Sequence, residues 1–244
     1  MNKKRYYEIA GMASKDETHP AQQEIVKYTK FARRVLDLGC GEGTRLLQLK
    51  TSAEKYGVDL SSFAVKIAKK KNSQIKFLKA DIKNLPFTDN YFDLIYSMFV
   101  IEHLIDPQKV LDEAIRILAK GGILIIGAPN YGSPNRHSPI SKENKFLKLL
   151  KGIFPKVEVN KLNWTKVGPY KGKYFIDSDT VVEPYLFSLT SYLKFKGMKI
   201  VKSSSLWSID DFSPKQLVFK ILGQLGIKPF IWWGPQILVI AEKI

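Results

Sequence analysis

The chain has little of what holds small extracellular or metal-bound domains together. Cys40 is the one cysteine among 244 residues, so no disulfide can form within the chain and no two-cysteine metal site exists. A lone thiol is typical of a reducing compartment. The first twenty residues turn polar where a signal peptide needs an apolar run. We therefore expect a cytoplasmic protein with no bound metal.

Long apolar runs and acidic residues are also scarce. The longest apolar stretches, near residues 123–126 and 237–241, fall far short of the ~20 residues that a membrane-spanning helix needs. The sequence has 39 Lys and Arg residues against 23 Asp and Glu residues, a net charge of +16. This excess favours anionic partners such as nucleic acid, acidic small molecules or an anionic membrane surface. A lysine-rich proteome would give the same excess without any partner.

The residues that are present follow an α/β pattern. From residue 33 onward, short β-branched runs alternate with helical patterns, which is typical of consecutive βα units in a parallel sheet. The pattern predicts strands at 34–38, 55–59, 75–80, 92–97, 123–127, 198–203 and 235–241, with helices at 61–70, 107–119, 179–196 and 214–225. A Ser61 cap begins the first of these helices, and Gly121-Gly122 is expected to end the second.

Three glycines follow the first predicted strand. In a doubly wound sheet the ligand lies beyond the carboxyl ends of the strands, next to the first βα turn, and here that turn contains Gly39, Gly41 and Gly43. Glycine lets the backbone approach a ligand closely and adopt positive φ. A dinucleotide fold needs its third glycine one residue later, where this chain has Thr44. The spacing therefore disfavours a dinucleotide.

Acidic residues around the turn point to a cationic ligand. Asp37 precedes the glycines and Glu42 lies among them, whereas a phosphate needs an electropositive turn. The ammonium and sulfonium groups of S-adenosylmethionine suit such carboxylates. Asp59, at the end of the second strand, is placed to accept hydrogen bonds from a ribose diol, and Asp81, at the end of the third, to meet the adenine amino group. Each acid alone could instead cap the next helix or turn.

Residues 35–129 resemble the class I S-adenosylmethionine-dependent methyltransferases, in particular the methyltransferase type 11 group. The resemblance covers about two-fifths of the chain. It rests on the stretches VLDLGCGEG, YGVDLS, FLKADIKNLPFTDNYFDLIYS, IEHL and LAKGGILIIGAPN, in the order and spacing of that family.

The resemblance implies a fold, a donor and a set of binding residues. The fold is a Rossmann-like, mostly parallel seven-stranded sheet with helices on both faces and a lid or insertion after the fifth strand. The donor is S-adenosylmethionine. The implied contacts are Gly39, Gly41 and Gly43 to the methionine part, Asp59 and Leu60 to the ribose, Asp81 and Ile82 to the adenine, and Ser97 or Met98 near the methyl group. Asp37 and Cys40, in the same first turn, complete the expected cofactor-binding set.

We divide the chain into four parts on this basis. Residues 1–32 are expected to form an N-terminal helical lid segment and residues 33–129 the S-adenosylmethionine-binding core. Residues 130–176 form a basic insertion that covers the acceptor, and residues 177–244 complete the sheet.

His103 is the candidate catalytic residue. Methyl transfer from a sulfonium is an in-line displacement, which mainly needs alignment, although a base helps if the acceptor is a hydroxyl or a carbon acid. His103 follows the fourth strand at the expected catalytic rim. Alternatively, Glu102 and His103 brace the helix that follows. Quinone-biosynthesis members resemble Glu-x-x-Glu-His at this turn, and Phe99 replaces the first acid here, which argues against a metal and against that assignment.

The insertion is strongly basic. Residues 130–176 contain ten Lys and Arg residues against two Glu residues, a charge of 10 − 2 = +8. Residues 141–154 are amphipathic, with apolar Phe146, Leu147, Leu150, Ile153 and Phe154 opposite Lys142, Lys145, Lys148 and Lys151. Such a helix can lie on an anionic membrane or clasp an anionic acceptor. We favour a lid helix whose apolar face packs on the domain while its lysines are solvated.

The sequence therefore predicts a methyltransferase acting on a small-molecule or lipid-linked, anionic acceptor. O-methylation is favoured over N- or C-methylation, and peripheral contact with an anionic inner membrane surface is a further expectation. RNA methylation and a non-catalytic S-adenosylmethionine-binding module are the alternatives. Nucleic acid is disfavoured because no known binding module is recognised. The acceptor and the oligomeric state stay open.

Overall fold

The computed structural model of the protein describes residues 11, 14–138, 140–141, 144–155, 157–168, 179–207 and 214–244. Much of the predicted N-terminal segment and of the second half of the insertion therefore lies outside the described residues. The chain divides into two compact units. The first comprises residues 1–98, 108–125 and 242–244, and the second comprises residues 99–107 and 126–241.

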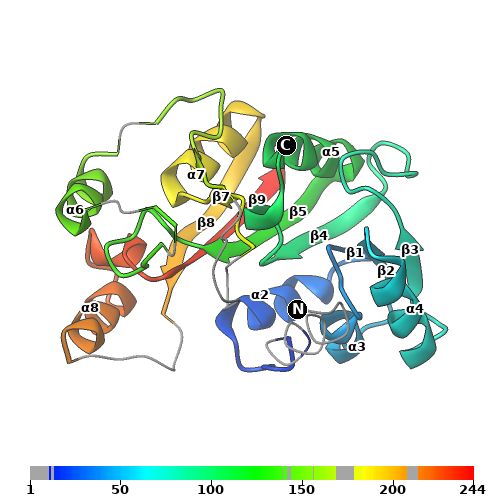
Figure 1. Ribbon diagram of the computed structural model, residues 1–244. Coiled ribbons are helices and arrows are strands. Elements are labelled where there is room, and N and C mark those ends of the chain that lie inside the picture. Colours follow the sequence, from blue (N-terminus) through cyan, green and yellow to red (C-terminus); the bar gives the residue numbers. More distant parts are fainter. Residues whose placement is uncertain are drawn as a thin grey trace. The chain divides into compact units, whose positions relative to one another are not determined.

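The main sheet has seven strands in the order β3-β2-β1-β4-β5-β9-β8 (Figure 1). This confirms the predicted fold class. The strands are β1 (Arg34–Leu38), β2 (Glu54–Asp59), β3 (Lys76–Lys79), β4 (Phe92–Met98), β5 (Leu118–Pro129), β8 (Met198–Leu206) and β9 (Gln236–Lys243).

The first unit contains the parallel core of the sheet. β1 pairs in parallel with β2 on one side and with β4 on the other, and β3 adds to β2. Val35, Leu36 and Leu38 of β1 are fully buried, as expected for a strand covered on both faces. In Figure 1, α5 (Pro107–Ile117) covers one face, and α2 (Pro20–Thr29), α3 (Thr44–Gln48) and α4 (Ser62–Lys71) cover the other.

The strand order reverses at β1. The chain runs outward from β1 through β2 to β3 and then returns to the other side of β1 as β4. In doubly wound sheets, ligands bind beyond the carboxyl ends of the strands at such a reversal. The residues that end β1 and β2 are therefore brought next to the residues that end β4.

Side chains at two helix starts set where these helices begin. The Ser61 hydroxyl accepts a hydrogen bond from the Ala64 amide at 3.3 Å, so the predicted cap of α4 is confirmed. His19 caps α2, because its Nδ1 accepts from the Ala21 amide at 3.2 Å. Pro20 follows at the first helical position, where its fixed φ suits a helix.

The predicted glycine end of α5 is wrong. α5 ends at Ile117, β5 begins at Leu118, and Gly121 and Gly122 lie inside that strand. The reason is that other groups satisfy the last helical carbonyls: the Tyr91 amide donates to Ile117 O at 2.8 Å and the Asn90 amide to Arg116 O at 3.1 Å. The helix therefore needs no glycine cap.

The second unit adds short elements around its part of the sheet. They are η1 (Ile101–His103), α6 (Lys145–Ile153), β6 (Thr165–Lys166), β7 (Val182–Glu183), α7 (Leu186–Phe195), α8 (Pro214–Gln224) and η2 (Phe230–Trp232). The prediction of one helix over 179–196 is wrong in its first part. Val182 and Glu183 pair antiparallel with β6, and Pro184 separates them from α7.

The apolar face of α6 contradicts the packing that we favoured for it. Phe146 is 62% exposed and Phe154 71% exposed, so this face does not cover a domain. Lys148 is buried instead, and its Nζ donates to the Arg136 carbonyl at 3.0 Å. The helix therefore turns a lysine inward and its large apolar side chains outward.

Lys243 stabilises the carboxyl end of α5 within the first unit. Its Nζ donates to the carbonyls of Ile115 and Leu118, each at 2.7 Å, and to Asn90 Oδ1 at 2.9 Å. A cation at this end of a helix also interacts favourably with the helix dipole.

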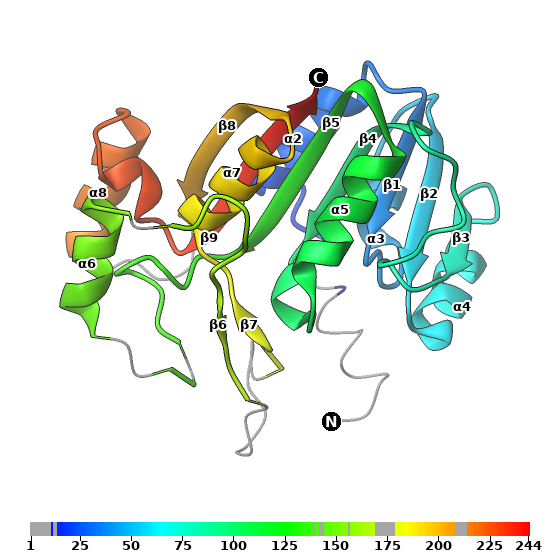
Figure 2. The same ribbon diagram turned by 90° about the horizontal axis from the view of Figure 1, so that it is seen from above.

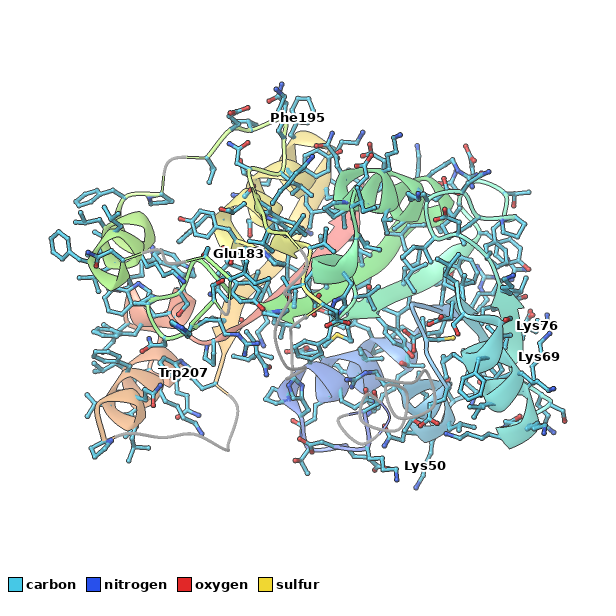
Figure 3. All side chains as sticks on the ribbon, in the orientation of Figure 1. Lys50, Lys69, Lys76, Glu183, Phe195 and Trp207 are labelled. Carbon is cyan, nitrogen blue, oxygen red and sulfur yellow. The ribbon has the colours of Figure 1, made fainter. Side chains whose placement is uncertain are left out.

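We expect Lys243→Met to lower the free energy of unfolding by about 1–2 kcal/mol, because two carbonyls lose a charged donor. Chemical denaturation monitored by circular dichroism measures this change. Lys50→Met, at an exposed lysine (Figure 3), serves as the control and should stay within about 0.5 kcal/mol of the wild type. Equal effects of the two substitutions would contradict the capping role.

Candidate active site

The glycine turn after β1 has the backbone that the sequence predicts. Gly39, Gly41 and Gly43 have φ values of 80°, 53° and 79°, a region that favours glycine. The amides of Gly39 and Cys40 both donate to the Val58 carbonyl, at 2.8 and 3.0 Å. The turn is therefore attached to the last residues of β2.

The Asp59 carboxylate joins the turn to the next helix. Its Oδ2 accepts from the Gly41 amide at 2.9 Å, and its Oδ1 accepts from the Ser61 amide at 2.8 Å. Each carboxylate oxygen has a further lone pair. Asp59 thus lies against the glycine turn, as predicted, and keeps capacity to accept from a hydroxyl.

An aromatic ring supports the turn from below. A Cβ atom at Gly43 would lie 2.6 Å from the Phe77 ring, and one at Gly57 would lie 2.7 Å from it. Real Cβ atoms do not approach that closely, so both positions need glycine for the ring to fit. Phe77 was not predicted as a member of the site. The glycine in the middle of β2 was the available signal, since such a residue often marks a close approach.

Asp37 is a buried carboxylate beneath this turn. It is 3% exposed, and burial raises its pKa to about 7, although the Arg45 guanidinium and the Tyr96 hydroxyl nearby act in the opposite direction. Burial also lowers the pKa of Arg45. A buried carboxylate without full compensation is stabilised by a cationic group. Arg45 and Tyr96 were not predicted as members of the site.

Glu42 contributes less negative charge to the turn than expected. Its Oε2 lies 2.9 Å from Lys71 Nζ, and its Oε1 accepts from the Thr44 hydroxyl at 3.0 Å. The carboxylate is therefore paired with a lysine of α4. The negative charge next to the glycines comes from Asp37 and Asp59.

Cys40 is a buried, free thiol in the same turn. Burial raises its pKa, and the charges of Asp37 and Asp59 raise it further. A thiol of raised pKa stays protonated and is a poor nucleophile. Cys40 therefore contributes shape to the turn.

Asp81 lies in the turn after β3 and is half exposed. Its Oδ1 accepts from the Lys83 amide at 3.0 Å, and its Oδ2 lies 3.3 Å from Lys83 Nζ. The hydrogen bond from the Lys83 amide lowers the pKa of Asp81, and the positive charge of the Lys83 side chain lowers it further. These contacts match the turn-capping alternative. Ile82 beside it is buried, whereas Leu60 is exposed, so the adenine and ribose roles of these residues stay predictions.

Ser97 and Met98 are buried at the end of β4. The Ser97 hydroxyl donates to the Leu38 carbonyl at 3.1 Å and so links the ends of β4 and β1. Ser97 therefore lies close to the glycine turn, as the sequence predicts. Its proximity to the transferred methyl group stays a prediction.

His103 in the second unit is held by residues from a distant segment. Its Nδ1 lies 3.2 Å from the Asp179 carbonyl oxygen and 3.6 Å from Asp179 Oδ1, and its Nε2 lies 3.8 Å from Glu102 Oε1. Glu102 is buried, and its carbonyl accepts from the Val181 amide at 2.8 Å. Asp179 was missed, because nothing in the sequence connects positions 76 residues apart.

Phe99 has a backbone conformation that is unusual for a bulky residue. Its φ is 59°, and its amide donates to the Gly127 carbonyl at 2.8 Å. Left-handed φ costs a residue with a Cβ about 1–2 kcal/mol, and such strain is concentrated at functional sites. Phe99 was noted only as a departure from a family motif, and its conformation was not predicted.

Comparison with known proteins identifies the central part of the chain. Residues 36–126 match the sequence model of a family described as a methyltransferase domain. This match covers less than half of the 244 residues, so it shows a similarity of the central part of the chain to that family. A solved S-adenosylmethionine-dependent methyltransferase from Aquifex aeolicus has the same fold, with a TM-score of 0.59, 15% identity and 100% coverage of both chains.

Two curated relatives each match part of the chain. A demethylmenaquinone methyltransferase of Paenarthrobacter aurescens is 36% identical over 40% of this chain, and an ajmaline N-methyltransferase of Rauvolfia serpentina is 36% identical over 40% of it. The chain spans 39% and 36% of the length of these relatives. Their names indicate different acceptors, so the similarity does not identify the acceptor of this chain.

The part of the chain that the structure describes shows neither a metal-binding cluster nor a membrane-spanning helix. No group of three or more His, Cys, Asp or Glu side chains in this part of the chain is placed to hold a metal ion. Among the described helices, none combines the length and apolar character needed to cross a membrane.

The pKa of Asp37 makes donor binding depend on pH. A group with a pKa of about 7 is mostly neutral at pH 6 and mostly ionised at pH 8. A cationic ligand prefers the ionised form, so we expect the affinity for S-adenosylmethionine to rise by up to about tenfold from pH 6 to pH 8. Isothermal titration calorimetry at the two pH values measures this change.

Asp37→Asn is the matched control, because it keeps the shape of the side chain and removes its titration. The difference between wild type and variant isolates Asp37 from any titration of the ligand. A wild-type affinity that changes with pH no more than that of Asp37→Asn would contradict the assignment.

Proposed function

We propose that the protein transfers a methyl group from S-adenosylmethionine to a small-molecule or lipid-linked, anionic acceptor. The observation that supports this most strongly is the Asp59 carboxylate bonded to the Gly41 amide above the buried Asp37. This combination suits a nucleoside joined to a cationic tail. The similarity of residues 36–126 to the methyltransferase family supports the same donor.

The residues of the first unit would bind and orient the donor. The glycine turn leaves room for the methionine part, Asp37 supplies negative charge for its cationic groups, and Asp59 accepts from the ribose. The bound donor supplies a methyl carbon attached to a positively charged sulfur. The acceptor attacks this carbon in line with the carbon–sulfur bond. Alignment of this kind accounts for much of the acceleration in such reactions.

His103 is the base in this proposal. When Nδ1–H donates to the Asp179 carbonyl, Nε2 carries the lone pair and can take a proton. The acceptor oxygen then loses its proton to Nε2 as it forms a bond to the methyl carbon, and the donor sulfur keeps the electrons of the broken bond. O-methylation is favoured because a hydroxyl acceptor benefits from this base.

RNA is the weaker alternative acceptor. Lys66, Lys69, Lys70 and Lys79 line a recess on α4 and β3, at the edge where Figure 3 labels Lys69. Such lysines suit phosphate contacts. Ser62 and Val65 complete the lining, and no aromatic side chain lies there for a base to stack on. The recess therefore offers phosphate contacts but no surface for base stacking, which makes it weak support for RNA binding.

Product formation tests the proposed activity. The protein is incubated with methyl-labelled S-adenosylmethionine and with cell extract separated into lipids, small polar metabolites and RNA. We expect label in the lipid or small-metabolite fraction. Label confined to RNA would favour the alternative acceptor, and no label in any fraction would favour a non-catalytic binding module.

His103→Asn should lower kcat on the identified acceptor by about 100-fold or more, because general bases contribute on that scale. His137→Asn, at a histidine in the loop after β5, is the matched control and should leave kcat unchanged. Affinity for S-adenosylhomocysteine should be the same in both variants. Equal turnover of His103→Asn and wild type would remove His103 from the mechanism.

A further inference from the structure

Two short helices of the second unit expose large apolar side chains at the same end of that unit. α6 and α8 both lie at the left of Figures 1 and 2. The exposed residues are Phe146, Leu147, Leu150, Ile153 and Phe154 in and after α6, and Leu217, Val218, Ile221, Leu225 and Ile227 in and after α8. We call these ten residues the α6–α8 apolar surface. Exposed apolar patches of this kind mark interaction sites.

The orientation of α6 is fixed by its polar contacts. Asn144 caps its start by accepting from the Phe146 amide at 2.9 Å, and Lys148 is anchored inward by its bond to the Arg136 carbonyl. Lys148 and the exposed Leu150 and Phe154 therefore lie on different sides of the helix. Rotating the helix to bury its apolar side would break the buried lysine contact.

α8 is apolar on its inner and its outer side. On the inner side, Phe219 packs against Phe230 and Trp233, with ring centroids 5.3 and 5.9 Å apart. Leu217, Val218 and Ile221 remain exposed on the outer side. The sequence of α8 also contains Lys215 and Lys220. The helix therefore combines exposed apolar side chains with positive charge.

The loop under α8 is firmly held within the second unit. Asn130 Nδ2 donates to the carbonyls of Trp232 and Gly234 at 3.0 and 3.1 Å, and Asn135 Nδ2 donates to Trp233 O at 2.9 Å. These bonds attach the start of the insertion to the loop that carries Phe230 and Trp233. The loop against which Phe219 of α8 packs is therefore held in place by hydrogen bonds.

The charge around the surface selects the partner. Besides the buried Lys148, residues 144–155 contain two lysines and residues 214–235 contain three, and neither stretch contains an acidic residue. A symmetric dimer would place these positive stretches against each other. An anionic lipid surface instead offers negative headgroups to the lysines and an apolar layer to the side chains.

We propose that the α6–α8 apolar surface docks the protein on an anionic lipid bilayer. The helices have nine and eleven residues, so they lie in the interface and do not span it. Short apolar helices rich in lysine bind by this combination of buried apolar area and charge. This docking holds whatever the methyl acceptor is, and it would place the protein where a lipid-linked acceptor is found.

Vesicle co-sedimentation tests the docking. We expect the full chain to sediment with vesicles of phosphatidylglycerol and phosphatidylcholine, and to stay in the supernatant with phosphatidylcholine alone. The double variant Phe154→Ser/Leu225→Ser should lower the partition coefficient by about tenfold or more, since each side chain is more than two-thirds exposed and loses its insertion. Added salt should weaken wild-type binding.

Phe195→Ser provides the matched control, because Phe195 is 55% exposed on α7 of the same unit, away from α6 and α8 (Figure 3). It should bind vesicles as the wild type does. No wild-type binding to anionic vesicles, or equal binding by the double variant, would overturn the proposal. A wild-type dimer that the double variant dissociates would identify a second copy as the partner and also overturn it. The double variant should bind S-adenosylhomocysteine with the affinity of the wild type. Loss of vesicle binding would then be independent of the donor site and of the proposed function.

Discussion

The hydrogen bonds of the Asp59 carboxylate are the constraint on which the rest of the site depends. One oxygen binds the Gly41 amide and the other the Ser61 amide, so a single side chain fixes the glycine turn and the start of α4. The turn can then adopt three positive φ values, and Phe77 fills the space that its glycines leave. Hydrogen bonds and packing within the protein therefore hold the shape of this turn.

The buried position of Asp37 lowers the stability of the unbound protein when this carboxyl group is ionised. Burial raises its pKa from 3.8 to about 7, so the folded state binds a proton more tightly than the unfolded state does. Stability of the unbound protein therefore falls as pH rises from 3.8 towards 7. A cationic ligand offsets this cost, because it gives the ionised carboxylate a partner. The same residue thus links binding to both charge and pH.

The glycine turn and the place of Asp59 beside it could be predicted from the sequence because their determinants are local. Glycine spacing and an acid at each strand end depend on a few neighbouring residues, and the structure places Asp59 and Ser97 beside the turn as expected. Arg45 and Tyr96 were missed, because only the packed sheet brings them to Asp37. Asp179 reaches His103 across 76 residues, through contacts that no local pattern encodes.

The second unit shows the limit of periodicity as a guide. The amphipathic pattern of residues 141–154 correctly indicated a helix, but it did not indicate which side faces the protein. The bond from Lys148 to Arg136 O decides that, and it reverses the expected packing. Similarly, pairing with Thr165 and Lys166 makes residues 182–183 a strand, although they lie inside a helical pattern.

The most direct test of the donor site is calorimetric titration with S-adenosylhomocysteine. We expect saturable binding with one site per chain. We expect the affinity to be lower by about 10-fold to 100-fold in Asp59→Ala, since a carboxylate that accepts from the ribose and orders the glycine turn is lost. Failure of the wild type to bind at high micromolar ligand, or equal affinity of wild type and Asp59→Ala, would contradict the account.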